Sequence, residues 1–288
     1  MIVGIIGAGT MGSGIAQVFA RTEGYKVRLC DINEQFAASG KNKIEGQLKG
    51  QVAKGKMTQE KADAILDNIT TGTKDICTDC DLIVEAAFES MEVKKDTFEA
   101  LNKICKPECI FASNTSSLSI TEIMTKAGRP LVGMHFFNPA PVLKLVEIIA
   151  GVNTPQEVVD EVTRIAIELG KEPVNVKEAP GFVVNRMLVP LVNEGIQIYS
   201  EGIASVEGID KAMRLGASHP MGPLALGDLI GLDVCLDIMD ILYKETGDGK
   251  YRACTLLRKM VRGGLLGRKT GKGFYDYSDP KNPVPMNI

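Results

Sequence analysis

Residues 2–31 of this 288-residue chain read IVGIIGAGTMGSGIAQVFARTEGYKVRLCD, and this stretch decides the fold. The apolar run that ends at Gly7 predicts a β-strand, residues 14–21 have a helical pattern, and Val27–Cys30 predicts a second strand. The turn between strand and helix reads Gly7-Ala8-Gly9-Thr10-Met11-Gly12. A strand, a glycine-rich turn, a helix and a second strand in this order predict the first βαβ unit of a mostly parallel sheet.

Each glycine of this turn has its own physical reason. Gly7 permits the tight turn, Gly9 lets the backbone approach a pyrophosphate with no Cβ in between, and Gly12 lets the helix pack closely on the strand. Asp31 lies nineteen residues after Gly12, where a carboxylate accepts hydrogen bonds from the adenosine ribose and repels a 2′-phosphate. The pattern therefore predicts an NAD site and disfavours NADP, an inference that nearby Arg28 weakens. The alternative is that the glycines only form a tight turn.

The rest of the chain predicts two domains of different class. Over the first 180 residues, strand-length segments alternate with helical patterns, which indicates a Rossmann-type α/β domain with a mostly parallel sheet. A lysine-rich helical hairpin is expected as an insertion at about residues 34–68. Residues 181–288 read as helices separated by Gly and Pro, so we expect a smaller all-α domain there. The predicted strands are Ile2–Gly7, Lys26–Asp31, Leu82–Ala87, Ile110–Ser113, Leu131–Phe137, Val146–Ile149 and Pro173–Val176.

One segment of the second domain suggests an interface. Residues from about Leu224 to Glu245 predict a single helix in which Asp233, Asp237 and Asp240 form a polar stripe and most other positions are apolar. Such a wide apolar face needs covering. We therefore expect a homodimer that packs through the second domain.

Composition excludes several classes of function. The net charge is −3, far from the basic balance that nucleic-acid binding usually requires. No apolar run reaches the length of a membrane span, and no basic region precedes Arg21 as a signal peptide would require. Seven cysteines do not indicate a disulfide framework and fit a reducing compartment, so we expect a cytoplasmic protein.

Two residues form a candidate acid–base pair. His135 lies at the end of a predicted strand, where ligands of open α/β sheets bind, and an imidazole can exchange a proton with a hydroxyl or carbonyl at neutral pH. Glu147 lies in the apolar strand Leu145–Ile149, where a lone carboxylate is costly and implies a partner. The pair is either a general acid/base with its orienting carboxylate or a satisfied core histidine beside an unrelated glutamate. His219, in a loop, is assigned no chemistry.

Short polar side chains gather in two further places. Ser113–Ser119, SNTSSLS, follows a predicted strand and could hydrogen-bond a ligand, whereas a helix N-cap explains any single serine equally well. Asn185 lies in the first helix of the second domain and shares a face with apolar positions, so its amide needs a partner.

Cys77-Thr78-Asp79-Cys80 is the one CxxC of the chain. No second CxxC and no Cys/His pair at zinc-site spacing accompanies it. Reduced thiols beside a buried strand are therefore favoured over a metal or redox site, and no metal is predicted.

Together these segments carry a family resemblance. The glycine turn, Ser113–Leu118, Gly133–Pro139 (GMHFFNP), Lys144–Ile148 (KLVEI) and Pro180–Arg186 (PGFVVNR) resemble 3-hydroxyacyl-CoA dehydrogenases, in particular the bacterial 3-hydroxybutyryl-CoA dehydrogenases. His219–Gly222 (HPMG) and Gly267–Tyr275 (GRKTGKGFY) extend the resemblance over nearly the whole chain. It implies an NAD-dependent oxidoreductase that acts on acyl-CoA substrates in fatty-acid or butyrate metabolism.

The resemblance also implies roles for individual residues. His135 becomes the catalytic acid/base and Glu147 its orienting carboxylate, while Ser116 and Asn185 hold the 3-oxygen and the neighbouring thioester of the substrate. Lys54 is expected at the CoA phosphates, although an ordinary solvated lysine is the alternative. Cofactor contacts are expected from Gly7, Ala8, Gly9, Thr10, Met11, Gly12, Asp31, Glu89, Lys94, Ser116, Asn138 and Lys269.

Two other functions stay open at this point. A dehydrogenase of similar architecture could act on a free hydroxyacid or a sugar acid, against which the lysine-rich insertion argues. A non-catalytic, crystallin-like NAD-binding protein could keep the fold alone. An intact set of Ser116, His135, Glu147 and Asn185 argues against that function.

Overall fold

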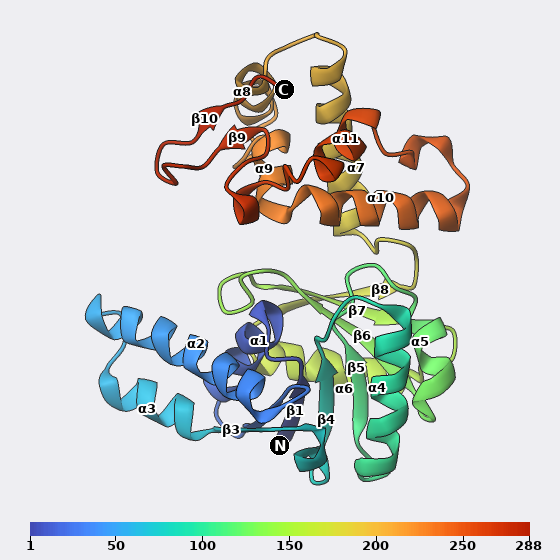
Figure 1. The fold of residues 1–288 in the computed structure, drawn as a ribbon. Helices are drawn as coiled ribbons and strands as arrows, with labels where there is room; N and C mark the ends of the chain where they lie inside the picture. Colours follow the sequence, from blue (N-terminus) through green and yellow to red (C-terminus); the bar gives the residue numbers. More distant parts are fainter. The chain divides into compact units, whose positions relative to one another are not determined.

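A computed structural model describes all residues from 1 to 288, and the chain divides into two compact units, Met1–Phe182 and Val183–Ile288 (Figure 1). The first unit is an α/β domain and the second is a mainly helical domain. No helix of either unit is both long and apolar enough to cross a lipid bilayer.

The first domain contains one eight-stranded sheet in the order β3-β2-β1-β4-β5-β6-β7-β8. Every neighbouring pair is parallel except β6 and β7, which are antiparallel. The predicted Rossmann-type, mostly parallel sheet is thus confirmed. The strands are β1 Ile2–Ile6, β2 Lys26–Cys30, β3 Ile69–Gly72, β4 Leu82–Glu85, β5 Ile110–Ser113, β6 Leu131–Phe136, β7 Leu145–Ala150 and β8 Glu172–Lys177.

Strand β3 is absent from the sequence prediction. Its four residues, ITTG, contain only one large apolar side chain, so the segment does not read as a strand. Parallel pairing with β2 at the edge of the sheet defines it instead, with Val27 opposite Ile69.

Helices cover both faces of this sheet. Apolar side chains of α1, α2, α3 and α6 form a core with one set of strand residues, including Val84. Those of α4 and α5 form a second core with the alternate set, including Ile83. This arrangement explains the near-continuous apolar strands. The helices are α1 Thr10–Ala20, α2 Glu34–Ala53, α3 Gln59–Asp67, α4 Met91–Ile104, α5 Ile120–Ala127 and α6 Gln156–Glu168, with a short 3₁₀ helix, η1, at Lys74–Cys77.

The expected insertion is the hairpin of α2 and α3. The side chain of Asn33 accepts a hydrogen bond from the Phe36 N–H and caps the start of α2. Only four residues of α2 are buried, so most of its lysines face solvent. At Gly40, a Cβ would lie 2.6 Å from the Cβ of Ala8, which shows how closely α2 packs on the glycine turn.

The second domain has its own apolar core, formed by its helices and by Phe274. Apart from a two-stranded ribbon it is helical, as expected. Its helices are α7 Val184–Ser200, α8 Val206–Gly216, α9 Pro223–Ile230, α10 Leu232–Thr246 and α11 Thr255–Arg262; η2 Gly249–Tyr251 and η3 Arg268–Thr270 are 3₁₀ turns, and β9 Tyr275–Asp276 pairs antiparallel with β10 Val284–Pro285.

The prediction of one helix from about Leu224 to Glu245 is wrong. Gly231, with φ +106°, separates α9 from α10. The Leu232 N–H donates to the carbonyl of Leu266 (3.1 Å), so the chain leaves the helical hydrogen-bond pattern at this point. A positive φ is a conformation that glycine adopts without strain.

Candidate active site

The glycine turn has the shape that a dinucleotide requires. Gly7 has φ +99°, and a Cβ on it would lie 2.5 Å from the carbonyl oxygen of Ala86. A Cβ on Gly12 would lie 1.7 Å from the Gly7 oxygen, whereas Gly9 faces open space. Gly7 and Gly9 line a cavity of about 780 Å³ at the carboxyl ends of the strands. The residues present therefore fit a pyrophosphate at the N-terminus of α1.

Asp31 is fixed beside this turn. Its carboxylate accepts hydrogen bonds from the N–H groups of Ala8 (2.6 Å) and Ile32 (2.7 Å), and it lines the same cavity. Arg28 is held elsewhere, with its guanidinium 2.8 Å from Asp79 and 3.1 Å from the hydroxyl of Thr70. The doubt that Arg28 raised about NAD preference is reduced, because its two terminal nitrogens already have partners.

His135 and Glu147 form a buried pair. They are opposite each other in the antiparallel register of β6 and β7, and Nδ1 of His135 lies 2.8 Å from Oε2 of Glu147. The exposed fractions of the two residues are 4% and 1%. With Nδ1 facing the carboxylate, Nε2 is the ring nitrogen left for proton exchange. The geometry brings together the two residues that sequence analysis singled out as a possible pair.

Neighbouring side chains hold the imidazole in place. The rings of Phe137 and Phe182 have centroids 4.5 Å and 5.7 Å from that of His135. The side-chain oxygen of Asn114 accepts a hydrogen bond from the Phe136 N–H (2.8 Å) and so joins the end of β5 to β6. Asn114 has no individual role among the predictions from the sequence.

The polar residues of Ser113–Ser119 have different hydrogen-bond partners. Ser119 is the N-cap of α5, since its side chain accepts from the Glu122 N–H (3.0 Å). Thr115 donates to Glu89 (2.6 Å), and the N–H of Ser116 donates to the same carboxylate oxygen (2.8 Å). Capping thus uses one serine of the segment, and Ser116 lies half-buried beside Glu89.

A cluster of charged side chains lies behind this segment. Lys94, with an exposed fraction of 1%, contacts Glu85 (2.8 Å) and Glu89 (3.1 Å). Desolvation would lower the pKa of Lys94, but the two carboxylates raise it above its ordinary value. Burial would likewise raise the pKa of Glu89, but Lys94, Thr115 and the Ser116 N–H lower it.

Glu85 is the member of this cluster that sequence analysis missed. It ends the apolar strand LIVE and is fully buried. The signal that singled out Glu147, a lone carboxylate in an apolar strand, was present here too.

The remaining predicted site residues lie in three settings. Asn138 is exposed in the turn after β6, where the bond to Pro139 is cis. Lys54 is exposed at the C-terminal end of α2. In the second domain, Asn185 lies in the first turn of α7, and Lys269 lies in η3 with its ammonium 2.5 Å from Asp233. The pairing of Lys269 with Asp233 is not among the predictions from the sequence.

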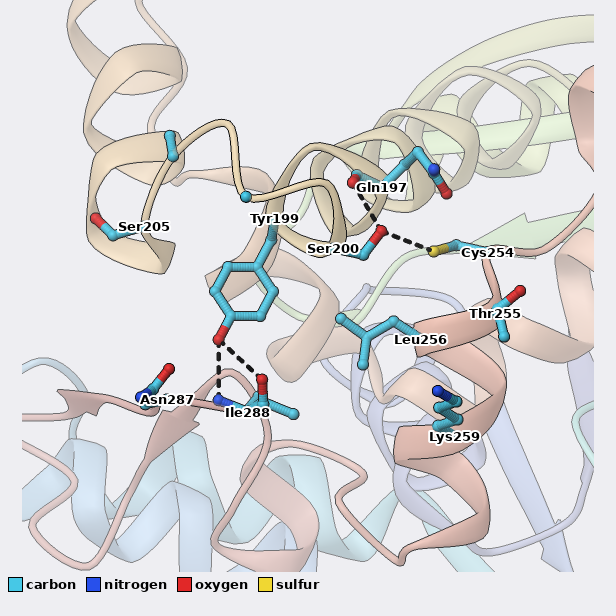
Figure 2. Close-up of a pocket in the computed structure, with 12 residues that line it drawn as sticks. Gln197, Tyr199, Ser200, Ser205, Cys254, Thr255, Leu256, Lys259, Asn287 and Ile288 are labelled. Atoms are coloured by element: carbon cyan, nitrogen blue, oxygen red, sulfur yellow. Dashed lines mark hydrogen bonds between the residues drawn. The ribbon is translucent and has the colours of Figure 1, made fainter.

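The second domain has a pocket of its own, which contains no histidine and no acidic side chain. This cavity of about 580 Å³ is lined by residues of α7, of the loop before α8, of α11 and of the C-terminal end of the chain. Figure 2 shows these side chains. The hydroxyl of Tyr199 accepts from the N–H of Ile288 (2.9 Å) and donates to its carbonyl (3.3 Å), and the Ser200 hydroxyl donates to the Gln197 carbonyl (2.8 Å). The pocket therefore contains no pair like that of His135 and Glu147.

The seven cysteines are buried free thiols. Cys77 lies with its sulfur 3.5 Å from that of Cys30, and this contact together with burial raises the pKa of the Cys77 thiol. No group of three or more His, Cys, Asp or Glu side chains is placed to hold a metal ion.

Comparison with known families agrees with this site. Residues 2–179 match the 3-hydroxyacyl-CoA dehydrogenase, NAD binding domain, and residues 181–277 match the 3-hydroxyacyl-CoA dehydrogenase, C-terminal domain. The chain belongs to the 3-hydroxyacyl-CoA dehydrogenase family. The predicted family and its NAD cofactor are thereby confirmed.

Within this family, similar proteins are named 3-hydroxybutyryl-CoA dehydrogenases. The chain is 51% identical to 3-hydroxybutyryl-CoA dehydrogenase of Clostridioides difficile over 96% of this chain and 100% of that protein. It is 48% identical to probable 3-hydroxybutyryl-CoA dehydrogenase of Bacillus subtilis, over 96% of each. The crystal structure of (S)-3-hydroxybutyryl-CoA dehydrogenase from Ralstonia eutropha matches with a TM-score of 0.92 and 44% identity, over 96% of this chain and 99% of that one.

Proposed function

We propose that this chain is an NAD-dependent (S)-3-hydroxybutyryl-CoA dehydrogenase. It would transfer hydride reversibly between C3 of a short (S)-3-hydroxyacyl-CoA and NAD. The single observation that carries the proposal is the buried His135–Glu147 contact of 2.8 Å at the end of β6. It supplies an acid/base in a family whose similar members are named for this reaction.

His135 acts as the acid/base in this proposal. In the oxidative direction, Nε2 takes the proton of the 3-hydroxyl while the C3–H bond breaks and the C3–O bond becomes a carbonyl. Bound NAD⁺ supplies the acceptor for the hydride. In the reductive direction Nε2 returns the proton to the oxygen. Glu147 fixes the tautomer by occupying Nδ1 and stabilises the imidazolium that forms.

Ser116 and Asn185 orient the substrate in this proposal. A hydroxyl and an amide suit the 3-oxygen and the neighbouring thioester, because both can donate to an oxygen. The bond from the Ser116 N–H to Glu89 supports the first assignment by fixing the backbone of this residue. The assignment of Asn185 is supported by its place in the family segment PGFVVNR.

The cofactor contacts are assigned to the glycine turn, to Asp31, to three further residues of the first domain and to Lys269 of the second domain. Gly7–Gly12 would hold the pyrophosphate and Asp31 the ribose. The nicotinamide half is assigned to Glu89, Asn138 and Lys269, and to Lys94 through its ion pair with Glu89. The fit of the glycine turn to a pyrophosphate supports the first part.

Lys54 is assigned to the CoA phosphates. Its exposure at the end of α2 supports this, because an ammonium in solvent can meet a mobile phosphate without first losing a protein partner.

A homodimer formed through the second domain, in the cytoplasm, completes the proposal. Large apolar side chains of this domain are exposed, among them Met187 (73%), Leu215 (75%) and Ile203 (66%), which favours an interface. Seven buried free thiols fit a reducing compartment. Light scattering at micromolar concentration tests the dimer, and a monomer there contradicts it.

The deciding experiment is NADH absorbance on mixing the purified protein with acetoacetyl-CoA, in parallel with NADPH and with free acetoacetate. Rapid NADH oxidation that requires the CoA moiety supports the proposal, and a preference for NADH over NADPH supports the role of Asp31. If NADH is oxidised with free acetoacetate and not with acetoacetyl-CoA, the protein is a dehydrogenase of free hydroxyacids. Tight NADH binding without turnover of any substrate indicates a non-catalytic NAD-binding protein.

A further inference from the structure

Glu85 is a buried carboxylate for which the acid–base mechanism has no use. Its side chain is fully buried at the carboxyl end of β4. Oε1 accepts from the N–H of Ala87 (2.7 Å) and from Lys94 (2.8 Å), and Oε2 accepts from Lys94 (3.0 Å) and from the hydroxyl of Ser113 (2.6 Å). Four hydrogen bonds to one buried carboxylate fix its position tightly.

Lys94 is shared between two carboxylates. Two of its contacts go to Glu85, and the third goes to Oε2 of Glu89 (3.1 Å). An ammonium has three N–H groups, so these contacts account for all of them. Of the three side chains, that of Glu89 is the exposed one (38%), while those of Glu85 and Lys94 are buried. Glu89 is therefore the member of this cluster that a bound molecule can contact, and Lys94 fixes its carboxylate.

Both carboxylates of this cluster also accept hydrogen bonds from the segment Ser113–Ser116. Glu85 binds the Ser113 hydroxyl, and that hydroxyl accepts from the Thr115 N–H (3.2 Å). Glu89 binds the Thr115 hydroxyl and the N–H of Ser116. Two carboxylates joined by one ammonium thus fix the backbone of Ser113–Ser116.

The charges of this cluster do not cancel. Two carboxylates and one ammonium sum to one negative charge at the carboxyl edge of the sheet, where the NAD-binding cavity lies. The oxidised nicotinamide ring carries a positive charge and the reduced ring carries none. A nearby negative charge in a partly desolvated site therefore favours the oxidised form of the cofactor.

We propose that Glu85 is a positioning residue for the reaction, which fixes Ser116 through Lys94 and Glu89 and supplies the uncompensated charge that favours NAD⁺ over NADH. This inference rests on the proposed function for the role of Ser116. Its charge component rests on cofactor binding and on the assignment of the nicotinamide half to Glu89.

Glu85→Gln tests both parts in the full chain, because it removes one charge with little change of shape. The dissociation constants of NAD⁺ and NADH are measured without acyl-CoA, from NADH fluorescence and its displacement by NAD⁺. We expect Glu85→Gln to weaken NAD⁺ at least about fivefold more than NADH, and to lower kcat with acetoacetyl-CoA about tenfold. Equal changes in both dissociation constants overturn the charge component, and an unchanged kcat overturns the positioning component.

Glu122→Gln is the matched control. Glu122 pairs with Lys95 of α4 at 2.8 Å, as Glu85 pairs with Lys94, but in an exposed setting. This variant removes the same unit of charge at the surface. The ratio of the two dissociation constants is expected to stay within about twofold of wild type. A shift equal to that of Glu85→Gln would show that position is irrelevant and would overturn the proposal.

The double variant Glu85→Gln/Lys94→Met separates charge from position and covers a folding failure of the single variant. It removes one charge of each sign, so Glu89 still leaves one negative charge. We expect the NAD⁺/NADH ratio to return to within about twofold of wild type while kcat stays low. A ratio as shifted as in Glu85→Gln contradicts the charge component, and a normal kcat contradicts positioning. If wild type binds both cofactors but turns over no acyl-CoA, the proposed function fails while the charge test stands.

Discussion

The two domains bury carboxylates in different surroundings. In the first domain, Glu147 faces His135 and Glu85 faces Lys94, so each carboxylate meets a group that can carry a positive charge. In the second domain, Asp228 accepts hydrogen bonds from two backbone N–H groups and one tyrosine hydroxyl, and no cation pairs with it.

The buried carboxylate of Asp228 has a structural role, because it links two segments of the second domain. The carboxylate of Asp228 (exposed fraction 1%) ties α9 to the N–H groups of Phe274 and Tyr275 and to the hydroxyl of Tyr277. A Cβ on Gly273 would lie 1.9 Å from Oδ1 of Asp228, so the glycine lets the C-terminal segment reach this carboxylate. Much of the family motif GRKTGKGFY therefore has a structural reason.

Asp210 repeats the pattern within the second domain. It accepts from the N–H groups of Leu224 (2.8 Å) and Ala225 (3.0 Å) at the start of α9, and from the hydroxyl of Tyr275 (2.8 Å). A carboxylate at a helix N-terminus is stabilised by the helix dipole. Backbone N–H groups and tyrosine hydroxyls therefore bind these two aspartates, whereas the imidazole of His135 contacts Glu147.

The largest expected effect is that of His135→Gln. This variant removes the acid/base and should lower kcat at least about 100-fold, or about 2.7 kcal/mol in the barrier, because proton transfer by a positioned side chain contributes that much. The dissociation constant of NADH should stay close to wild type. Steady-state kinetics with acetoacetyl-CoA and NADH fluorescence measure both. A kcat within threefold of wild type would remove His135 from the chemistry.

The second prediction concerns Asp228 and the pH dependence of stability. Burial, despite its hydrogen bonds, raises the pKa of Asp228 to about 6, against roughly 3.9 in an unfolded chain. Between pH 4 and 6 the folded state therefore binds more protons than the unfolded state, and the free energy of unfolding falls as pH rises. A shift of about two units corresponds to roughly 2–3 kcal/mol over this interval.

Urea unfolding of wild type and Asp228→Asn from pH 4 to 7 measures this slope. Five of the six tyrosines are in the second domain and the chain has no tryptophan, so tyrosine fluorescence reports mainly on that domain. The free energy of unfolding of wild type, measured relative to that of Asp228→Asn, should fall as pH rises to 6 and then stay constant. Asp279→Asn is the control, because hydrogen bonds from Asn282 and the Lys281 N–H lower the pKa of Asp279. Its contribution to stability is nearly complete above the unfolded pKa of roughly 3.9, so this difference should stay nearly constant over the measured range. A constant difference for Asp228→Asn would contradict the assignment.

The sequence could predict much of the fold, because the strands are short apolar runs with clear ends. It could not predict β3, whose residues ITTG are identified as a strand only by pairing with β2. The glycine at 231 was a visible break signal, but the apolar periodicity on both sides favoured one helix. Its positive φ depends on contacts between distant segments, such as Leu232 with Leu266.

The candidate site was predictable as a set of residues and not as a set of contacts. His135 and Glu147 stand out by type, but their pairing depends on the antiparallel register of β6 and β7, which periodicity does not contain. Glu85 carried the same signal as Glu147 and was missed, since its partner Lys94 lies on a helix rather than a neighbouring strand. The partners of buried charges therefore require the tertiary structure.

The third prediction uses Glu147→Gln to test whether the first-domain pair differs from the second-domain carboxylates. Glutamine can still accept a hydrogen bond at Nδ1 of His135 but no longer stabilises an imidazolium. We expect kcat to fall about tenfold, or about 1.4 kcal/mol in the barrier, with little change in NADH affinity. A variant that loses thermal stability but keeps kcat would place Glu147 with Asp210 and Asp228, as architecture.

The smallest expected effect comes from Lys54, a charge exposed to solvent rather than buried in either domain. Lys54→Ala should raise the KM for acetoacetyl-CoA about three- to tenfold and leave kcat unchanged, because a contact remote from C3 is equal in the ground and transition states. Salt should diminish the difference from wild type, since exposed charges are screened. Lys49→Ala is the matched control on the same helix, where Lys49 already pairs with Glu45 at 2.6 Å. A KM that rises equally in both variants would show that the hairpin attracts the substrate by its general charge, and a fall in kcat at constant KM would remove Lys54 from the CoA site.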